Sequence, residues 1–237
     1  GQVIINNLCA YIRSPFLLAE RAEQLDKPYA KDLQKNFGGD KEKFDADQQT
    51  FKQCKATLEE ERQVRQSIIK EIRERLGNKI ESGSWSDFDY DFLNAYFFYV
   101  VSFNHSYFSA SLNFAGAKFT RDTSFSLVTF AQNTNFSLVT FAQDADFSRA
   151  KFIKSPDFSR AKFIKSPDFS RVVFLQGADF SRAKFTKGLE FSGVANFFGS
   201  EFTKDAVFSR AVFLQGADFS RAKFTKGIDL FGAEFAG

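Results

Sequence analysis

The side chains of this chain that could do chemistry are arginines at a regular spacing. The candidate surface ladder consists of Arg149, Arg160, Arg171, Arg182, Arg210 and Arg221, most of them eleven residues apart. A guanidinium keeps its charge at all physiological pH values and matches carboxylates and phosphates with two parallel hydrogen bonds. The ladder is therefore a candidate surface for phosphate or an acidic partner. A carboxylate three residues before four of them could neutralise each locally: Asp146, Asp157, Asp168 and Asp179. The simpler interpretation is a solvated exterior that carries charges of both signs.

Catalytic chemistry has few candidates in this sequence. His105 is the single histidine, and no Ser/His/Asp set or Gly-rich phosphate loop accompanies it. Cys9 and Cys54 lack metal-ligand spacing, so we expect no metal site and no cofactor. Two unpatterned cysteines also suit a reducing compartment, which predicts a cytoplasmic protein. We expect a protein that is not an enzyme.

The charge balance bears on possible partners. The formal net charge is +3. Residues 101–237 carry 17 Lys and Arg against 12 Asp and Glu, or +5, so direct nucleic-acid binding is not expected. No apolar run reaches the 18 residues of a membrane span. The chain opens on Gly-Gln-Val and resembles an excised fragment, so an upstream anchor could still hold it on the cytoplasmic face of a membrane.

These surface residues are set by a repeat of phenylalanine. A first series recurs every eleven residues at Phe103, Phe114, Phe125, Phe136, Phe147, Phe158, Phe169, Phe180, Phe191, Phe202, Phe213, Phe224 and Phe235. A second series lies between its members, from Phe108 to Phe185, and resumes one residue late at Phe197, Phe208, Phe219 and Leu230. The gaps alternate five and six, with one six-six pair at 185–191–197. An internal repeat of this kind indicates a solenoid.

The alternation of side chains along a strand gives the repeat its physical meaning. Residues i and i−2 point the same way, so each Phe and the Ala often found two places before it face inward. The first series from Phe103 to Phe224 is the predicted core. Coils of 22 residues with four sides, about six in number, suit bulky rings best, and flat coils of eleven residues are the alternative. The six-six pair is expected to turn every later surface column, including Arg210 and Arg221, by one face.

Written out, two successive units read A-D-F-S-R-A-K-F-I-K-S (145–155) and P-D-F-S-R-A-K-F-I-K-S (156–166). This A-x-F-[ST]-x pattern resembles the pentapeptide-repeat family from about Phe92 to the end. The resemblance implies a mainly β fold, a right-handed quadrilateral β-helix. It also implies a non-catalytic scaffold or protein-binding module. Some members mimic duplex DNA and modulate DNA gyrase, which is an alternative, but that role needs an acidic rod and this repeat region is basic.

The first third of the chain has helical rather than β periodicity. Residues 2–13 place Ile4, Ile5, Leu8, Tyr11 and Ile12 on one face, and residues 41–76 carry an apolar stripe between Asp40 and Gly77. We predict an α-helical head (1–80) that caps the β-helix (85–237). Two of its segments, 8–13 and 62–72, resemble the helical segments of actinobacterial members. The open C-terminal end is expected to favour self-association, because unpaired strand edges pair with other strands.

Overall fold

A computed structural model describes residues 1–29, 36–77, 85–165, 167–185, 195–197, 200–202, 206–213 and 217–235. The chain divides into two compact units, which are described separately. One unit contains residues 1–14 and 68–237, and the other contains residues 15–67.

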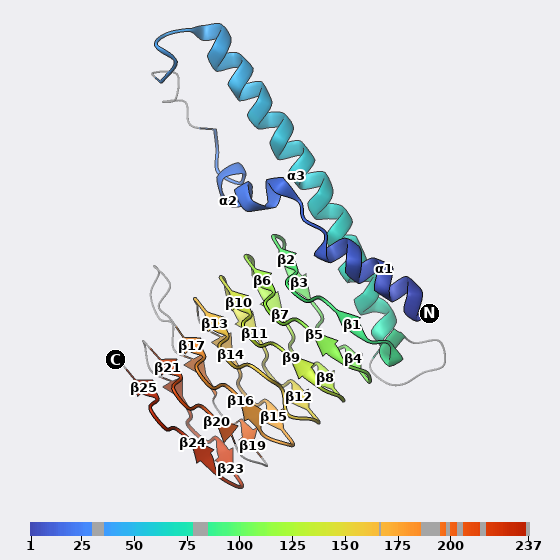
Figure 1. Cartoon of the computed structure of the whole chain (residues 1–237), viewed down its shortest axis with the longest axis vertical. Helices are drawn as coiled ribbons and strands as arrows, with labels where there is room; N and C mark the ends of the chain where they lie inside the picture. The colour runs from blue at the N-terminus through green and yellow to red at the C-terminus, as the bar shows by residue number, and fades with distance from the viewer. Residues whose placement is uncertain are drawn as a thin grey trace. The chain divides into compact units, whose positions relative to one another are not determined.

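The larger unit is a β-solenoid with four faces, each a ladder of two-residue parallel strands (Figure 1). Face A consists of β1 (Tyr90–Asp91), β5 (Leu112–Asn113), β9 (Thr134–Asn135), β16 (Ala178–Asp179), β20 (Ala206–Val207) and β24 (Ile228–Asp229). Face B consists of β2 (Tyr96–Phe97), β6 (Lys118–Phe119), β10 (Thr140–Phe141), β13 (Lys162–Phe163), β17 (Lys184–Phe185), β21 (Val212–Phe213) and β25 (Glu234–Phe235). Asp157 bridges Asn135 and Asp179, and so joins the two halves of face A.

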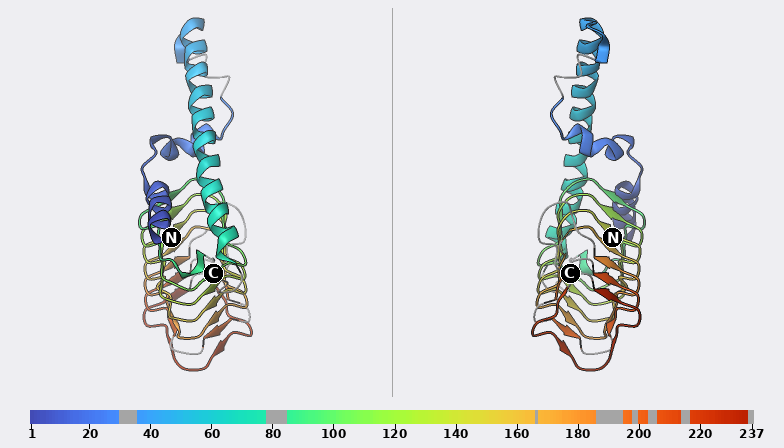
Figure 2. Two further views of the ribbon diagram at one scale, coloured as in Figure 1. Left: turned by 90° about the vertical axis from the view of Figure 1, so that its right-hand side faces the viewer. Right: turned by 90° about the vertical axis from the view of Figure 1, so that its left-hand side faces the viewer.

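The other two faces complete the four sides. Face C consists of β3 (Val101–Ser102), β7 (Thr123–Ser124), β11 (Ala145–Asp146), β14 (Pro167–Asp168), β18 (Ala195–Asn196) and β22 (Ala217–Asp218). Face D consists of β4 (Tyr107–Phe108), β8 (Thr129–Phe130), β12 (Lys151–Phe152), β15 (Val173–Phe174), β19 (Glu201–Phe202) and β23 (Lys223–Phe224). The chain visits the faces in the order A, B, C, D and then returns to A one coil further along (Figure 2).

The strand register confirms the coil of 22 residues. Lys118 pairs with Thr140, and Thr140 pairs with Lys162, in each case 22 positions later. The alternative coil of eleven residues is wrong, because no neighbouring strands among those described pair at that separation.

The interior is filled by phenylalanine rings that stack from coil to coil. Phe158 lies 4.8 Å from both Phe136 and Phe180, with the ring planes parallel to within 2°. Neighbouring columns meet edge to face, as Phe158 does with Phe147 at 5.5 Å. The two arrangements are those that the ring quadrupole favours. The predicted core residues from Phe103 to Phe180, together with Phe202 and Phe213, are at most 1% exposed. Phe224 is half-buried in the last coil, and Phe191 lies outside the described residues.

The six-six step does not turn the later columns by one face, so that prediction is wrong. Phe180 stacks on Phe208 and Phe174 on Phe202, each 28 positions later rather than 22. The chain therefore inserts six additional residues between Phe185 and Ala195, in the connection from face B to face C. The columns then continue in place, because the strands on both sides of the insertion keep their parallel partners, as Val173 does with Glu201 and Lys184 with Val212. Residues 186–194 of that connection are outside the described part.

Helix α1 (Gln2–Arg13) packs on the first coil and belongs to the larger unit. Its buried side chains are Ile5, Cys9 and Ile12, at spacings of four and three. Ile4 is 56% exposed, so the buried face of the helix differs from the predicted face by a rotation of about one residue. The Arg13 guanidinium pairs with the Asp91 carboxylate of β1 and fixes the end of the helix to the coil. The short 3-10 helix Trp85–Asp87 leads into β1.

Helix α3 (Lys41–Leu76) has the bounds that the sequence predicts. Asp40 accepts a hydrogen bond from the Lys43 N–H at 3.1 Å, as an N-cap does, and Gly77 ends the helix at φ 59°. The smaller unit contains the part of α3 up to Ser67, together with a 3-10 helix (Leu17–Arg21) and α2 (Ala22–Leu25). Arg62 binds Asp26 at 3.0 Å there. No described helix has both the length and the hydropathy of a membrane span.

Candidate functional site

Each arginine of the ladder sits in a tight corner with the local sequence Phe-Ser-Arg, followed by Ala or, at Arg171, by Val. An aspartate precedes the phenylalanine in every case except Arg210, where Val207 takes its place. In the corner at Phe158, the Ala161 N–H donates to the Phe158 carbonyl at 3.1 Å, which closes a four-residue turn. Arg160 occupies the third place of that turn at φ 57°. A positive φ costs a non-glycine residue about 1–2 kcal/mol, so the fold imposes this conformation on each arginine. It directs the side chain away from the solenoid.

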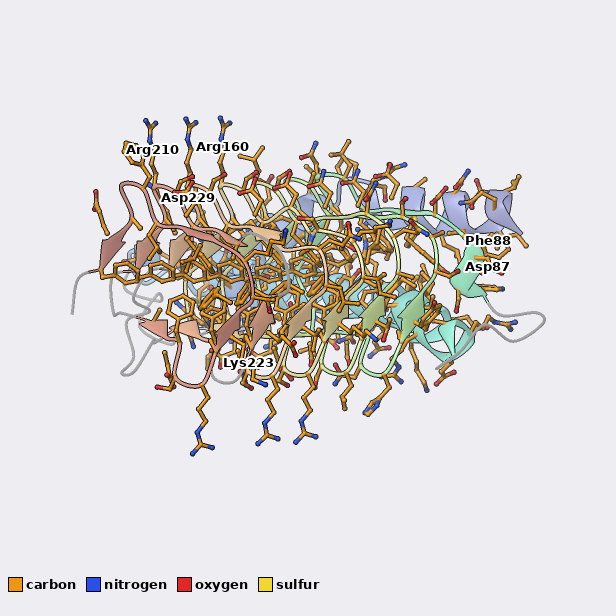
Figure 3. The ribbon with its side chains drawn as sticks, turned by 90° about the horizontal axis from the view of Figure 1, so that it is seen from below. Asp87, Phe88, Arg160, Arg210, Lys223 and Asp229 are labelled. Atoms are coloured by element: carbon orange, nitrogen blue, oxygen red, sulfur yellow. The ribbon has the colours of Figure 1, made fainter. Side chains whose placement is uncertain are left out.

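Three arginines form a row along the corner between faces A and B. The Arg160 N–H donates to the Ser181 carbonyl at 2.8 Å, and the Arg182 N–H donates to the Ser209 carbonyl at 2.8 Å. These bonds place Arg160, Arg182 and Arg210 on successive coils. Figure 3 shows Arg160 and Arg210 pointing outward on the same side of the solenoid, with Lys223 toward the opposite side. All three arginines are exposed.

Aspartates form a second row beside the arginines. Asp157 Oδ1 accepts from the Ser159 N–H at 2.8 Å, and Asp179 Oδ1 accepts from the Ser181 N–H at 2.7 Å. Asp229 accepts from the Phe231 N–H in the same way. These carboxylates thus build the turns, and each keeps its second oxygen for another donor.

Arg160 and Arg182 form no direct ion pair with Asp157 or Asp179. Within the part of the chain that the structure describes, no carboxylate lies within 4.0 Å of either guanidinium. Asp157 and Asp179 therefore offset the arginine charge across the groove rather than through a contact with the arginine three residues later. The aspartate is held by the turn N–H, while the left-handed backbone directs the arginine outward.

Serines lie between the two rows and form the floor of an open groove of about 730 Å³. The floor serines are Ser137, Ser159, Ser181 and Ser209. Leu138, 55% exposed, lies at one end, and Phe231, 74% exposed, lies at the other. We call this the A/B groove. Its charged lining consists of three arginines (160, 182, 210) and three aspartates (157, 179, 229), so its formal charge is zero.

A second groove of about 530 Å³ lies on the diagonally opposite corner, between faces C and D. Its arginines are Arg149 and Arg171, and its aspartates are Asp168 and Asp218. The Ser126 and Ser148 hydroxyls are 3.0 Å apart along its floor. Hydrogen bonds from the Ser220 hydroxyl and N–H hold the pKa of Asp218 below its ordinary value. We call this the C/D groove.

The ladder arginines thus lie in two rows on opposite corners, as the coil of 22 residues predicts. Arg149 and Arg171 lie on the C/D corner. Arg221 belongs there too, because Phe219 stacks on Phe197 and Phe197 on Phe169. Arg210 continues the row of Arg182 and does not move to another face. The serine floor and the apolar ends were not singled out from the sequence, although Ser precedes every arginine of the ladder.

The grooves have the chemistry of recognition. Their side chains offer guanidinium and hydroxyl donors and carboxylate acceptors. Among the described residues, no group of three or more His, Cys, Asp or Glu side chains is placed to hold a metal ion. The backbone N–H and C=O groups of the corners are bonded between coils, as at Arg160 and Ser181. A ligand would therefore meet side chains rather than an open backbone edge.

A comparison with protein families supports the assignment of the repeat. A family model described as pentapeptide repeats (9 copies) matches residues 103–151 and 147–195. The comparison with curated proteins and the comparison with solved structures found no match.

Proposed function

Because the β-solenoid of this chain carries pentapeptide repeats, we propose that the protein is a non-catalytic scaffold that binds another protein through the side-chain rows on its corners. The observation that carries this proposal is the A/B groove, in which arginine, serine and aspartate rows run in parallel over successive coils. Stacked rings fill the interior, which leaves the outer rows as the variable surface. Such repeated, rigidly spaced side chains suit a protein surface of matching period.

Recognition by the grooves can be tested with a photoreactive residue. Placed at Ser159, in the A/B groove, it should cross-link a partner protein in extracts from the source cells. Replacing the arginine row (R160Q/R182Q/R210Q) should abolish that cross-link, because the guanidinium charges are removed while the turns remain. A matched control replaces lysines on faces B and D (K151Q/K162Q/K184Q). Equal cross-linking by all three proteins would contradict the proposal.

The gyrase alternative has less support from the surface. Duplex DNA presents a dense negative charge, and a mimic needs the same. The A/B groove is formally neutral and its protruding side chains are cationic. Added protein should therefore leave gyrase supercoiling unchanged at micromolar concentration.

Self-association through the last described coil is a second proposal. In that coil Ile228 is 39%, Leu230 41% and Phe235 52% exposed, whereas equivalent side chains in earlier coils are buried. The strands β22, β23, β24 and β25 each end a ladder among the described residues. Unpaired edges with apolar side chains favour pairing between copies. We expect chain 1–237 to form end-to-end dimers by light scattering, and the variant L230K/F235K to lose them. A monomer at all concentrations would contradict this.

A further inference from the structure

The A/B groove carries two parallel rows of opposite charge, separated by a row of serines. Along the chain the corners at Arg160 and Arg182 read Asp, Phe, Ser, Arg, so the carboxylates lie on the face A side and the guanidiniums at the turn. The corner at Arg210 has Val207 in place of the aspartate, and the corner at Asp229 has Gly232 in place of the arginine. Adjacent levels are one coil apart, which the ring stacking sets at about 5 Å. The surface therefore has three parallel rows along the solenoid: negative aspartates, small polar serines and positive arginines.

A ligand that carries charges of only one sign, such as a simple polyanion or polycation, does not match this pattern. Three aspartates and three arginines line the groove, so a polyanion that meets the arginines also meets the carboxylates. A polycation has the reverse problem. A matching partner has to present a positive row and a negative row at the same spacing, in the opposite order across the groove. Such complementarity determines which partner fits and how it is oriented.

A second copy of this chain meets that requirement in one orientation. We infer that two copies pair through their A/B grooves, with the two solenoids parallel and related by a two-fold axis along their length. This inference rests on the proposed function, because it names the protein that the groove binds. The two-fold rotation exchanges the sides of the groove, so the arginine row of each copy faces the aspartate row of the other. An antiparallel pair would place like charges opposite each other.

Two levels match directly in this arrangement. Arg160 faces the partner's Asp157, and Arg182 faces the partner's Asp179. Arg210 lies one coil from the levels of Asp179 and Asp229. Each of these aspartates uses Oδ1 in its own turn, which leaves Oδ2 as an acceptor across the interface. Charge-assisted bonds of this kind are short and directional.

The serine floor and one exposed ring support the same geometry. Ser159, Ser181 and Ser209 lie on the axis, where small side chains let two surfaces approach. Phe231 occupies the serine position of the last corner and is 74% exposed. In the parallel pair it meets the partner's Phe231, and the contact removes both rings from water. The C/D groove has no aromatic side chain in this position among its lining residues.

The first experiment measures association of chain 1–237 by sedimentation velocity. A concentration-dependent dimer is expected, and it should weaken with added salt because the charge pairs lie near the surface. R160Q/R182Q/R210Q and D157N/D179N/D229N should each raise the dissociation constant about tenfold or more. The Asp→Asn changes keep the turns, since Asn135 already accepts the Ser137 N–H at 2.9 Å.

Charge exchange then tests the row-to-row contact. R160E/R182E/R210E has an entirely acidic groove and should be monomeric. Mixed with D157N/D179N/D229N, it should form a heterodimer. The arginine row of the Asp→Asn variant then faces the aspartate row of the Arg→Glu variant. Association that is unaffected by these changes would overturn the inference, as would a monomer at every concentration.

Disulfide cross-linking distinguishes the two orientations. In a Cys54→Ser background, S159C and S209C proteins are mixed and oxidised, and the products are identified by mass spectrometry. The parallel pair predicts 159–159 and 209–209 bonds, whereas 159–209 bonds would show an antiparallel pair and overturn the inference. The L230K/F235K changes, which should prevent end-to-end dimers, are added as a control and should leave these cross-links in place. If no lateral dimer forms while R160Q/R182Q/R210Q still loses a cross-linked partner, the scaffold function stands and only this inference fails.

Discussion

At the scale of the residue, each inward phenylalanine contributes to two kinds of aromatic contact at once. Phe158 is completely buried, stacks on two rings of its own column and meets three others edge to face. Because parallel columns leave no space for rearrangement, a truncation there should leave a cavity.

Phe158→Ala should therefore lower the free energy of unfolding by about 3–5 kcal/mol, which chemical denaturation can measure. Val100→Ala shortens a side chain that is 53% exposed and lines neither groove, and it serves as the control, with an expected change within about 0.5 kcal/mol. Comparable losses in the two variants would mean that the interior is not closely packed.

The turn aspartate gives a second prediction at this scale. Asp157→Ala leaves the Ser159 N–H without the acceptor at 2.8 Å and should cost about 1 kcal/mol. Asp157→Asn should cost almost nothing, because an amide oxygen accepts the same bond at Asn113 and Asn135. Thermal unfolding of the two variants checks this, and equal destabilisation would indicate that the charge itself stabilises the corner.

At the scale of the element, helix α1 shields the first coil through side chains that the sequence predicts only in part. Its periodicity identified a helix, but several rotations about its axis satisfy an apolar pattern that includes both Ile4 and Ile5. Packing on β1 and β2 selected Ile5, Cys9 and Ile12. The side chain of Cys9 is 2% exposed as a result.

Burial raises the pKa of Cys9 from 9.0 to about 11. The folded state therefore holds the thiol proton more tightly than the unfolded state does, so this contribution to stability is complete below pH 9 and is lost as the pH rises toward 11. Iodoacetamide at pH 8.5 should alkylate Cys54 first and reach Cys9 only when urea unfolds the chain. Equal rates in the native protein, measured by mass spectrometry, would contradict the packing of α1. In addition, C9A should lose less stability than the parent between pH 9 and pH 11.

The insertion between Phe185 and Ala195 gives the last prediction at this scale. Deleting residues 189–194 leaves Phe-Thr-Lys-Gly-Ala-Asn-Phe, which follows the pattern of 224–230 and has the length of a regular corner. Because the strands on both sides already continue the same ladders, the deletion should leave the melting temperature within a few degrees of the parent. Deleting six residues from a regular corner, 164–169, is the control and should disrupt the fold. Loss of cooperative unfolding in the first variant would show that the insertion supports the solenoid.

At the scale of the whole molecule, the sequence predicts the interior well and the exterior less well. The coil size follows from the alternating gaps of five and six, because Phe fills inward positions on all four faces. That uniformity also explains the wrong prediction after Phe185. Both series are Phe, so the type of residue does not distinguish an insertion from a rotation.

The surface motif contained the missing signal. The segment Phe-Ser-Arg begins at first-series phenylalanines up to Phe180. After the insertion it begins at the second-series phenylalanines Phe208 and Phe219. This motif marks the tight corner. Its move from the first series to the second therefore indicates that second-series rings continue the columns of first-series rings, while the corners stay in place. The pairing of Asp157 with Arg160 could not be judged in this way, because it depends on a turn hydrogen bond and a positive φ.

Each coil contacts only the coils before and after it, so coil number is a quantity that can change without altering the fold. The segment 145–166 already contains two nearly identical units in succession. Duplicating 22 such residues in the gene would lengthen the A/B groove by one level, with one more arginine, serine and aspartate. Replication slippage at repeated DNA makes such duplications frequent, and selection would then act on the number of levels. The valency of the surface would evolve in whole steps, each adding one contact on each side of the pair.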